Sequence, residues 1–319
     1  MLYISQIGDA QNPPPYTFPD VDINSFRLAV DLDVLTALCD ELLNIGDPDD
    51  RGFEYRPVFP FVDLEVLHYP KMEYGLFPPA GFVSQHECYV RFFVMKYIGW
   101  NGWLWPDGEM AVFCPMLIVD NPWSAFAGRD VMGLPKLLGH FTPFSAASPS
   151  VTIKTEVFRD LFVGQKSTVE AVVTIAEAPK GAKAMKPSKD GKWPWGDIED
   201  DAIGAAEQVL GKSLVFAPTI FECVALKQFR DAMNPFDACY QAILQSFTFV
   251  ETIADLEELP PVRITLNDYA TFDLASRLGL PSGEPLTPIA QFHVRCSFSF
   301  GDTLTLFTND SRPFWCRWL

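Results

Sequence analysis

A single lysine, Lys136, stands directly after a proline in an apolar stretch of the chain. Its neighbours run from Val131 to Pro135 on one side and from Leu137 to Gly139 on the other. An ammonium group in such surroundings would be poorly solvated, so burial favours the neutral amine. A neutral amine is a nucleophile toward carbonyl carbon and forms a Schiff base with ketones. The stretch therefore indicates a lysine suited to carbonyl chemistry.

Arg129 lies seven residues before this lysine. A guanidinium group at that distance can supply a fixed cation or hold a carboxylate with two hydrogen bonds. The alternative is structural: Lys136 extends to solvent along its alkyl chain, and Arg129 pairs with Asp130. Spacing leaves both interpretations open.

The motif Gly128-Arg129-Asp130, three further residues and Leu134-Pro135-Lys136 resembles the signature of the acetoacetate decarboxylase family. In that family Gly-Arg-Glu and a short spacer precede an apolar or aromatic residue, proline and the Schiff-base lysine. The match covers residues 118–139, and a weaker similarity in strand order runs through much of the chain. The resemblance implies that Lys136 and Arg129 are catalytic. It also implies an antiparallel sheet curled into a cone-like barrel around the lysine, with a few flanking helices and no cofactor.

The chain departs from this family's pattern in three places, of which the second lysine and the N-terminal arginine come first. Leu137 occupies the position of a second lysine, so activation by a neighbouring cation is absent. On a strand this position faces away from Lys136, and burial then has to activate the amine alone. The family's N-terminal arginine aligns near Val21, and the nearest arginine is Arg27.

The acid that the family places before its motif has no single counterpart. Counting back without gaps arrives at Tyr97, and the nearest acids are Glu87, Asp107 and Glu109. The choice among them stays open.

Three tryptophans, at positions 100, 103 and 105, crowd the same region. They indicate either an aromatic wall for a substrate bulkier than acetoacetate or ordinary packing of the barrel. We expect substrate contacts from six residues: Trp103, Trp105, Tyr97, Ile118, Leu134 and Glu109.

Short aromatic and β-branched runs dominate the chain and predict an α+β protein that is mainly β. The clearest strand is 289–300, where five apolar residues alternate with polar ones, and Gly301-Asp302 predicts a turn into a further strand, 303–307. Other predicted strands are 88–98, 110–119, 151–158 and 168–176. Two helices are expected: 32–45, between Asp31 as cap and Gly46 as stop, and 236–247, after Asn234-Pro235.

One domain, 1–319, accounts for the whole length, with an extended N-terminal arm at 1–25. Residues 178–201 form a lysine-rich insertion, which is either an anion-binding lid or a solvated loop. Residues 206–213 match a relaxed phosphate-loop pattern. The acidic stretch before them predicts a helix over 198–209, ended by Gly211, rather than a buried strand, so nucleotide binding is disfavoured.

Composition narrows the function classes. The chain has 24 Lys and Arg residues against 41 Asp and Glu, a net charge of −17 at pH 7. This charge disfavours binding to nucleic acid and to anionic membranes. Seven cysteines with no paired spacing predict reduced thiols in a cytoplasmic protein, and the N-terminus shows no signal peptide. Four scattered histidines do not suggest a metal site.

Together these features predict a Schiff-base enzyme acting on a small-molecule keto substrate, most simply a β-keto acid decarboxylase. A lyase of this kind is expected to be a homo-oligomer by analogy with the family. One alternative is an aldolase, dehydratase or cyclase that uses the same iminium on a bulkier substrate. Another is a barrel that binds a ligand without catalysis.

Overall fold

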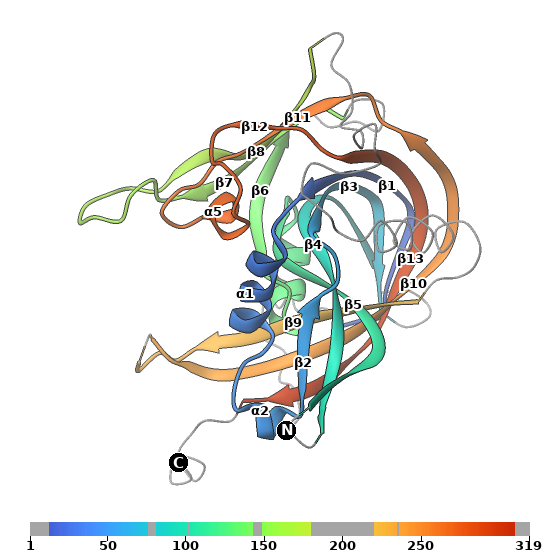
Figure 1. Cartoon of the computed structure of the whole chain (residues 1–319). Helices are drawn as coiled ribbons and strands as arrows, with labels where there is room; N and C mark the ends of the chain where they lie inside the picture. The colour runs from blue at the N-terminus through green and yellow to red at the C-terminus, as the bar shows by residue number, and fades with distance from the viewer. Residues whose placement is uncertain are drawn as a thin grey trace, which may run out of the picture.

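The computed structural model describes the chain in six ranges and is dominated by long strands (Figure 1). The described residues are 13–75, 81–100, 103–142, 149–179, 220–234 and 236–309. They contain one sheet of thirteen strands with a few short helices against it. The predicted α+β class, mainly β, is therefore confirmed.

The strands are β1 (Tyr16–Ala29), β2 (Phe53–Pro57), β3 (Phe61–Tyr74), β4 (Gly81–Trp100), β5 (Trp103–Val119), β6 (Lys136–Thr142), β7 (Val151–Val157), β8 (Thr168–Glu177), β9 (Ile220–Arg230), β10 (Ala238–Glu258), β11 (Val262–Leu266), β12 (Pro285–Leu286) and β13 (Ala290–Thr308). The helices are α1 (Leu32–Leu42), α2 (Pro48–Arg51), α3 (Pro122–Phe126) and α5 (Leu274–Arg277), with a π-helical turn, η1 (Ala127–Val131).

Seven of these strands close into a ring. Following the hydrogen-bonded neighbours from β5 leads through β9, β10, β13, β1, β3 and β4 and back to β5. Register shifts at four points along β10 let this strand bend around the ring. Figure 1 shows β10 and β13 curving together on one side of the molecule, with β3 and β4 across from them.

All neighbouring strands of the ring are antiparallel except β5 and β9, which run parallel. Outside the ring, β6 also runs parallel to β5. β9 pairs with the middle of β5 and β6 with its end, so the two neighbours share one edge of this strand. From β6 a branch of the sheet continues through β7, β8, β11 and β12. The predicted antiparallel sheet is thus a mixed one, and the parallel pairs lie where the lysine motif begins.

The predicted helix at 32–45 is present as α1. The side chain of Asp31 accepts a hydrogen bond from the Asp33 amide at 2.8 Å, which caps the helix as expected. The helix ends earlier than predicted, at Leu42 with Leu43 as its C-cap, so Gly46, with φ +76°, lies beyond its end and is not the stop. Leu35 and Leu38 lie on the buried face of the helix and pack in the largest core cluster.

Two predicted elements are wrong. Residues 236–247 do not form a helix: Asp231 and Asp237 close a turn, and the chain continues as β10. Gly301 is no turn either, because β13 runs through it without a break. A Cβ at this glycine would lie 2.9 Å from the Phe249 ring, so the residue allows close packing between β13 and β10.

Other predictions meet the structure only in part. Residues 16–25, assigned to an arm, belong to β1, which pairs with both β3 and β13 inside the ring. The lysine-rich stretch beyond Pro179 and the predicted helix at 198–209 lie outside the described residues. Within the six described ranges, no helix has the length and apolar character needed to cross a bilayer.

Candidate active site

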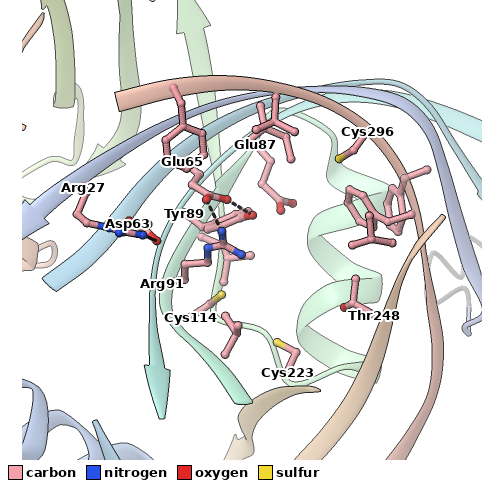
Figure 2. A pocket seen from close by; sticks show the side chains of 18 of the residues that line it. Arg27, Asp63, Glu65, Glu87, Tyr89, Arg91, Cys114, Cys223, Thr248 and Cys296 are labelled. Atoms are coloured by element: carbon pink, nitrogen blue, oxygen red, sulfur yellow. Dashed lines mark hydrogen bonds and ion pairs between the residues drawn. The ribbon is translucent and has the colours of Figure 1, made fainter. Parts of the chain in front are cut away.

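A cavity of about 790 Å³ occupies the interior of the seven-stranded ring (Figure 2). All seven ring strands and β6 contribute side chains to its wall. Because successive side chains of a strand point to opposite faces, alternate residues of each strand reach the interior. The alternation is clearest on β4, whose inward residues are Gln85, Glu87, Tyr89, Arg91 and Phe93.

Lys136 opens β6 and lies in the wall of this cavity. Its side chain is buried, with a relative exposure of 8%. The Nζ atom donates hydrogen bonds to Oε2 of Glu87 at 2.8 Å and to Oγ of Ser124 at 3.0 Å. The amine therefore stands beside a buried carboxylate and a hydroxyl, in a chamber large enough for a ligand.

The segment before the lysine is built to hold it. Asn121 caps α3 by accepting hydrogen bonds from two backbone amides, and this helix places Ser124 at the amine. The π-helical turn follows, and the Leu134 amide donates to the Gly128 carbonyl at 2.9 Å. Gly133, with φ +72°, redirects the chain into β6. The motif thus folds around the Lys136 side chain and fixes its position.

Glu87 is itself held by two neighbours. Tyr69 donates a hydrogen bond to Oε1 at 3.2 Å, and the Gln85 amide donates to Oε2 at 3.4 Å. Burial, reinforced by the negative charge of Glu87, raises the pKa of Tyr69 well above its ordinary value. The tyrosine therefore stays protonated and remains a donor to the carboxylate.

A second polar cluster centres on Glu65, on the neighbouring strand β3. This carboxylate accepts hydrogen bonds from Ser25 and Tyr89 and pairs with Arg91 at 2.6 Å. Burial raises the pKa of Glu65, and the positive charge of Arg91 acts in the opposite direction. Figure 2 shows Glu65 joined to Tyr89 and to Arg91 on one side of the cavity.

Arg27 and Asp63 form a third polar pair at the same wall. The guanidinium holds both carboxylate oxygens, at 2.8 and 3.1 Å, and stacks over the Phe61 ring at 3.8 Å. This two-pronged geometry fixes the arginine in place. Arg27, the arginine nearest the expected family position, therefore does line the cavity.

The opposite wall comes from β10 and β13 and is apolar apart from Thr248, Glu257, Glu258 and Gln291. The alternation predicted for 289–300 is confirmed, and its apolar face points into the cavity. The β13 members are Phe292, Val294, Cys296, Phe298 and Phe300, and those of β10 include Val250 and Ile253. A ligand in this chamber would meet charged groups on one side and hydrocarbon on the other.

The predicted site residues separate into two groups. Lys136 and Leu134 line the cavity. Arg129 is exposed on the π-helical turn and is not part of the lining, because the turn points Gly128 rather than Arg129 at the lysine. Ile118 is fully buried in the hydrophobic core behind the wall.

The predicted aromatic wall also lies elsewhere. Trp105 is 59% exposed and pairs with Ile98 where β4 and β5 extend beyond the cavity. Tyr97 is half-buried, opposite Pro106 in the same extension, and is not in the lining. For Trp103 and Glu109 the structure describes the β5 backbone but not the side chains. The aromatic surface of the cavity comes instead mainly from β13.

The structure describes the side chains of two of the three acids that the sequence left open. Of these two, Glu87 contacts Lys136, whereas Asp107 pairs with Lys96 at 3.1 Å. Sequence reasoning missed Glu65 and Arg91 altogether. The signal for both was present: Arg91 is the one charged residue of the apolar run 88–95, and Glu65 stands with Asp63 in the otherwise apolar run 61–67.

In the part of the chain that the structure describes, no group of three or more His, Cys, Asp or Glu side chains is arranged to hold a metal ion. The chemistry available on the cavity wall is that of an amine, carboxylates, phenols, guanidinium groups and thiols.

The sequence matches no known family profile and no curated protein sequence. Its fold resembles a crystal structure of acetoacetate decarboxylase from Legionella pneumophila, with a TM-score of 0.54, 14% identity and coverage of 93% of this chain and 88% of that one. An acetoacetate decarboxylase-like enzyme from Sphingomonas wittichii aligns at 0.49, with 12% identity over 94% and 96% of the chains. The enduracididine biosynthesis enzyme MppR, complexed with pyruvate, aligns at 0.46, with 13% identity over 92% and 91%. The chain therefore has the acetoacetate decarboxylase fold, which confirms the fold expected from the motif.

Proposed function

We propose that this chain is a lysine Schiff-base enzyme acting on a keto acid or a larger keto substrate. One observation carries the proposal: the Lys136 amine is buried in the wall of a large cavity, 2.8 Å from the carboxylate of Glu87. A nucleophile within hydrogen-bond reach of a base that is itself held by a third group is the arrangement that covalent catalysis requires. Tyr69 is that third group.

The contacts support a balanced sequence of proton transfers. A proton passes from the Lys136 ammonium to Glu87. The freed amine attacks the ketone carbon, and a proton moves from the attacking nitrogen to the carbonyl oxygen, which becomes a hydroxyl. Glu87 then returns its proton to this hydroxyl, which leaves as water as the C=N bond forms. Ser124 holds the nitrogen in position through these steps, because its hydroxyl lies 3.0 Å from Nζ.

Decarboxylation is the simplest reaction from this iminium. The electrons of the bond to the carboxylate move into the iminium as CO₂ leaves, and an enamine remains. Protonation of the enamine carbon and hydrolysis by water then release the product and restore the amine. The negative charge of Glu87 near the reacting centre disfavours a second carboxylate there and favours its loss as neutral CO₂.

The size of the cavity favours a substrate larger than a four-carbon keto acid. A volume of about 790 Å³ falls in the range of pockets that enclose drug-sized ligands. The apolar side of β10 and β13 suits a hydrocarbon or aromatic tail. A larger substrate also admits the second reaction type, in which the enamine attacks another carbonyl in an aldol or cyclisation step.

Trapping with borohydride tests the proposal. The protein is incubated with pyruvate, β-keto acids and aromatic keto acids, reduced, digested and mapped by mass spectrometry. We expect a reduced adduct on Lys136, absent in Lys136→Met and retained in Lys154→Met, which removes an exposed lysine of β7. Release of CO₂ with a trapped substrate then separates decarboxylation from aldol chemistry.

Two outcomes would contradict the proposal. An adduct that is equally abundant on exposed lysines would mean that Lys136 has no special reactivity. The absence of any adduct on folded protein, together with ligand binding in the same cavity, would instead identify a binding barrel.

A further inference from the structure

Two free cysteines, Cys114 and Cys223, lie side by side in the cavity wall. They come from the neighbouring parallel strands β5 and β9, in which Cys223 stands opposite Val112. Cys114 is two residues further along β5 and therefore points to the same face, as the diagonal neighbour. Figure 2 shows both sulfur atoms on the same side of the cavity, below Arg91, with Cys296 across from them.

Both residues of this pair are buried, with a relative exposure of 8% each, and both side chains line the same wall of the cavity. Among the other cysteines that the structure describes, Cys39 and Cys88 are buried in the core and do not line the cavity, Cys296 lies on the other wall, and Cys239 is half-buried outside the lining.

We propose that Cys114 and Cys223 form a redox-sensitive dithiol in the cavity wall, which a hydroperoxide converts into a disulfide. The proposal goes beyond the Schiff-base function and does not depend on it. The cavity gives a small oxidant access, because its lining includes the exposed residues Glu257 and Glu258 and so reaches the surface.

The environments of the two sulfur atoms differ and assign their roles. The hydrogen bond from Cys114 lowers the pKa of Cys223, and the positive charge of Arg91 acts in the same direction. The same hydrogen bond, together with burial, raises the pKa of Cys114 well above its ordinary value. Cys223 is therefore the thiolate that attacks, and Cys114 is the thiol that resolves.

The reaction balances without a cofactor. The Cys223 thiolate attacks one oxygen of the hydroperoxide, the O–O bond breaks, and the other oxygen leaves as an alcohol or water after taking up a proton. The sulfur of Cys114 then attacks the resulting sulfenic acid, the S–O bond breaks, and water leaves with the proton of Cys114. Two thiols and one hydroperoxide give one disulfide, one water and one alcohol, or two waters from hydrogen peroxide.

Closing this bond would change the cavity. A disulfide has an S–S length of about 2.05 Å and requires close Cα positions, whereas these residues are diagonal neighbours. The middle of β5 and β9 must therefore move together when the bond forms. Lys136 pairs with the end of the same β5 strand, at Leu117, so oxidation is expected to disturb the position of the amine.

The test uses the reduced full-length protein. It is exposed to tert-butyl hydroperoxide, blocked with N-ethylmaleimide and digested without reductant for mass spectrometry. We expect a peptide pair joined through Cys114 and Cys223 that separates with dithiothreitol, while Cys296 remains free for alkylation. Lys136→Met should form the same disulfide at the same rate. The test of the dithiol is therefore independent of whether the Schiff-base proposal holds.

Single variants test the assigned roles. In Cys114→Ser, Cys223 should stop at the sulfenic acid and be trapped by dimedone. In Cys223→Ser, Cys114 should stay unmodified, and Cys296→Ser should behave as the wild type. Thermal melts of each variant check that it is folded. Phenylarsine oxide provides an independent test of the dithiol: it should bind the wild type 1:1 and should not bind the Cys114→Ser or Cys223→Ser variant. Oxidation of Cys296 at the same rate, or a link that forms only in denatured protein, would overturn the proposal.

Discussion

Gly128 leaves the space that the alkyl chain of Lys136 occupies. A Cβ atom on this glycine would lie 2.5 Å from Cδ of the lysine and 2.6 Å from its Cε. Contacts under 3 Å do not occur between carbon atoms that are not bonded, so any larger residue at 128 has to displace the lysine. The close approach explains why a glycine stands in the π-helical turn before β6.

Gly128→Ala is therefore expected to disable the amine without unfolding the chain. The methyl group pushes Nζ away from Glu87, and a displacement of about 1 Å costs on the order of 100-fold in rate. The measurement is the rate of borohydride-trapped adduct formation. Gly99→Ala is the matched control, because it adds a methyl group to a strand glycine with no atom within 4 Å. Equal rates in the two variants would contradict the assigned geometry.

Glu87→Gln is expected to slow adduct formation by roughly 10²- to 10⁴-fold, because the amide cannot take up the ammonium proton. The measurement is the rate of borohydride-trapped adduct formation at one pH, compared between the variant and the wild type. Asp107→Asn, at the acid that pairs with Lys96, should match the wild type.

Ser124→Ala is expected to have a smaller effect than either change. It removes one of the two hydrogen bonds from Nζ, at 3.0 Å, and leaves the bond to Glu87. One such bond contributes about 1 kcal/mol, which corresponds to roughly a fivefold slower trapping rate. Rescue by Ser124→Thr would show that the hydroxyl positions the amine, whereas an equal loss in both variants would indicate a packing defect in α3.

Ile253→Trp is expected to change the range of substrates. Ile253 lines the apolar side of the cavity on β10 and is only half-buried, so a larger ring there fills cavity space without overpacking the core. Trapping of pyruvate should stay within about twofold, while trapping of aromatic keto acids falls by about tenfold or more. Leu304→Trp, at an exposed residue of β13 outside the lining, should leave both rates unchanged.

His68 is expected to make stability depend on pH. Burial, and secondly the neighbouring His86, lower its pKa below the ordinary 6.5, whereas Asp22 and Asp120 act in the opposite direction. At a pH between the pKa of His68 in the folded protein and 6.5, the unfolded chain binds more protons than the folded one. The free energy of unfolding therefore falls as the pH drops through this range. Urea unfolding at pH 8 and pH 5 should show a smaller loss in His68→Gln than in the wild type. His140→Gln, which changes an exposed histidine, should lose as much stability between pH 8 and pH 5 as the wild type.

The sequence was most informative where a pattern acts over a short distance. The alternation on 289–300 identified the apolar wall of the cavity because side chains on a strand must alternate. The cap at Asp31 identified α1 for an equally local reason, a hydrogen bond two residues away. The apolar setting of Lys136 left its burial open, and the resemblance of the motif to the acetoacetate decarboxylase signature favoured a buried amine.

Residues far apart in the chain were harder to combine. Counting back without gaps reached Tyr97, ten residues from Glu87, because the spacing between this acid and the motif depends on the length of the hairpin formed by β4 and β5, which no local pattern predicts. Residues 236–247 were read as a helix because a proline after an asparagine also begins turns, and only pairing with β9 decides the outcome. Arg129 was placed in the site because spacing alone does not reveal a π-helical turn.

The parallel pairing of β5 with β6 also has an evolutionary consequence. Leu117 stands opposite Lys136, and a slip of one residue would turn the amine to the other face of the sheet. The crossover from Val119 to Lys136 therefore tolerates sequence drift far better than changes in length. Insertions are expected to accumulate in the exposed connection at 158–167, while this crossover keeps a constant number of residues among proteins that share the lysine.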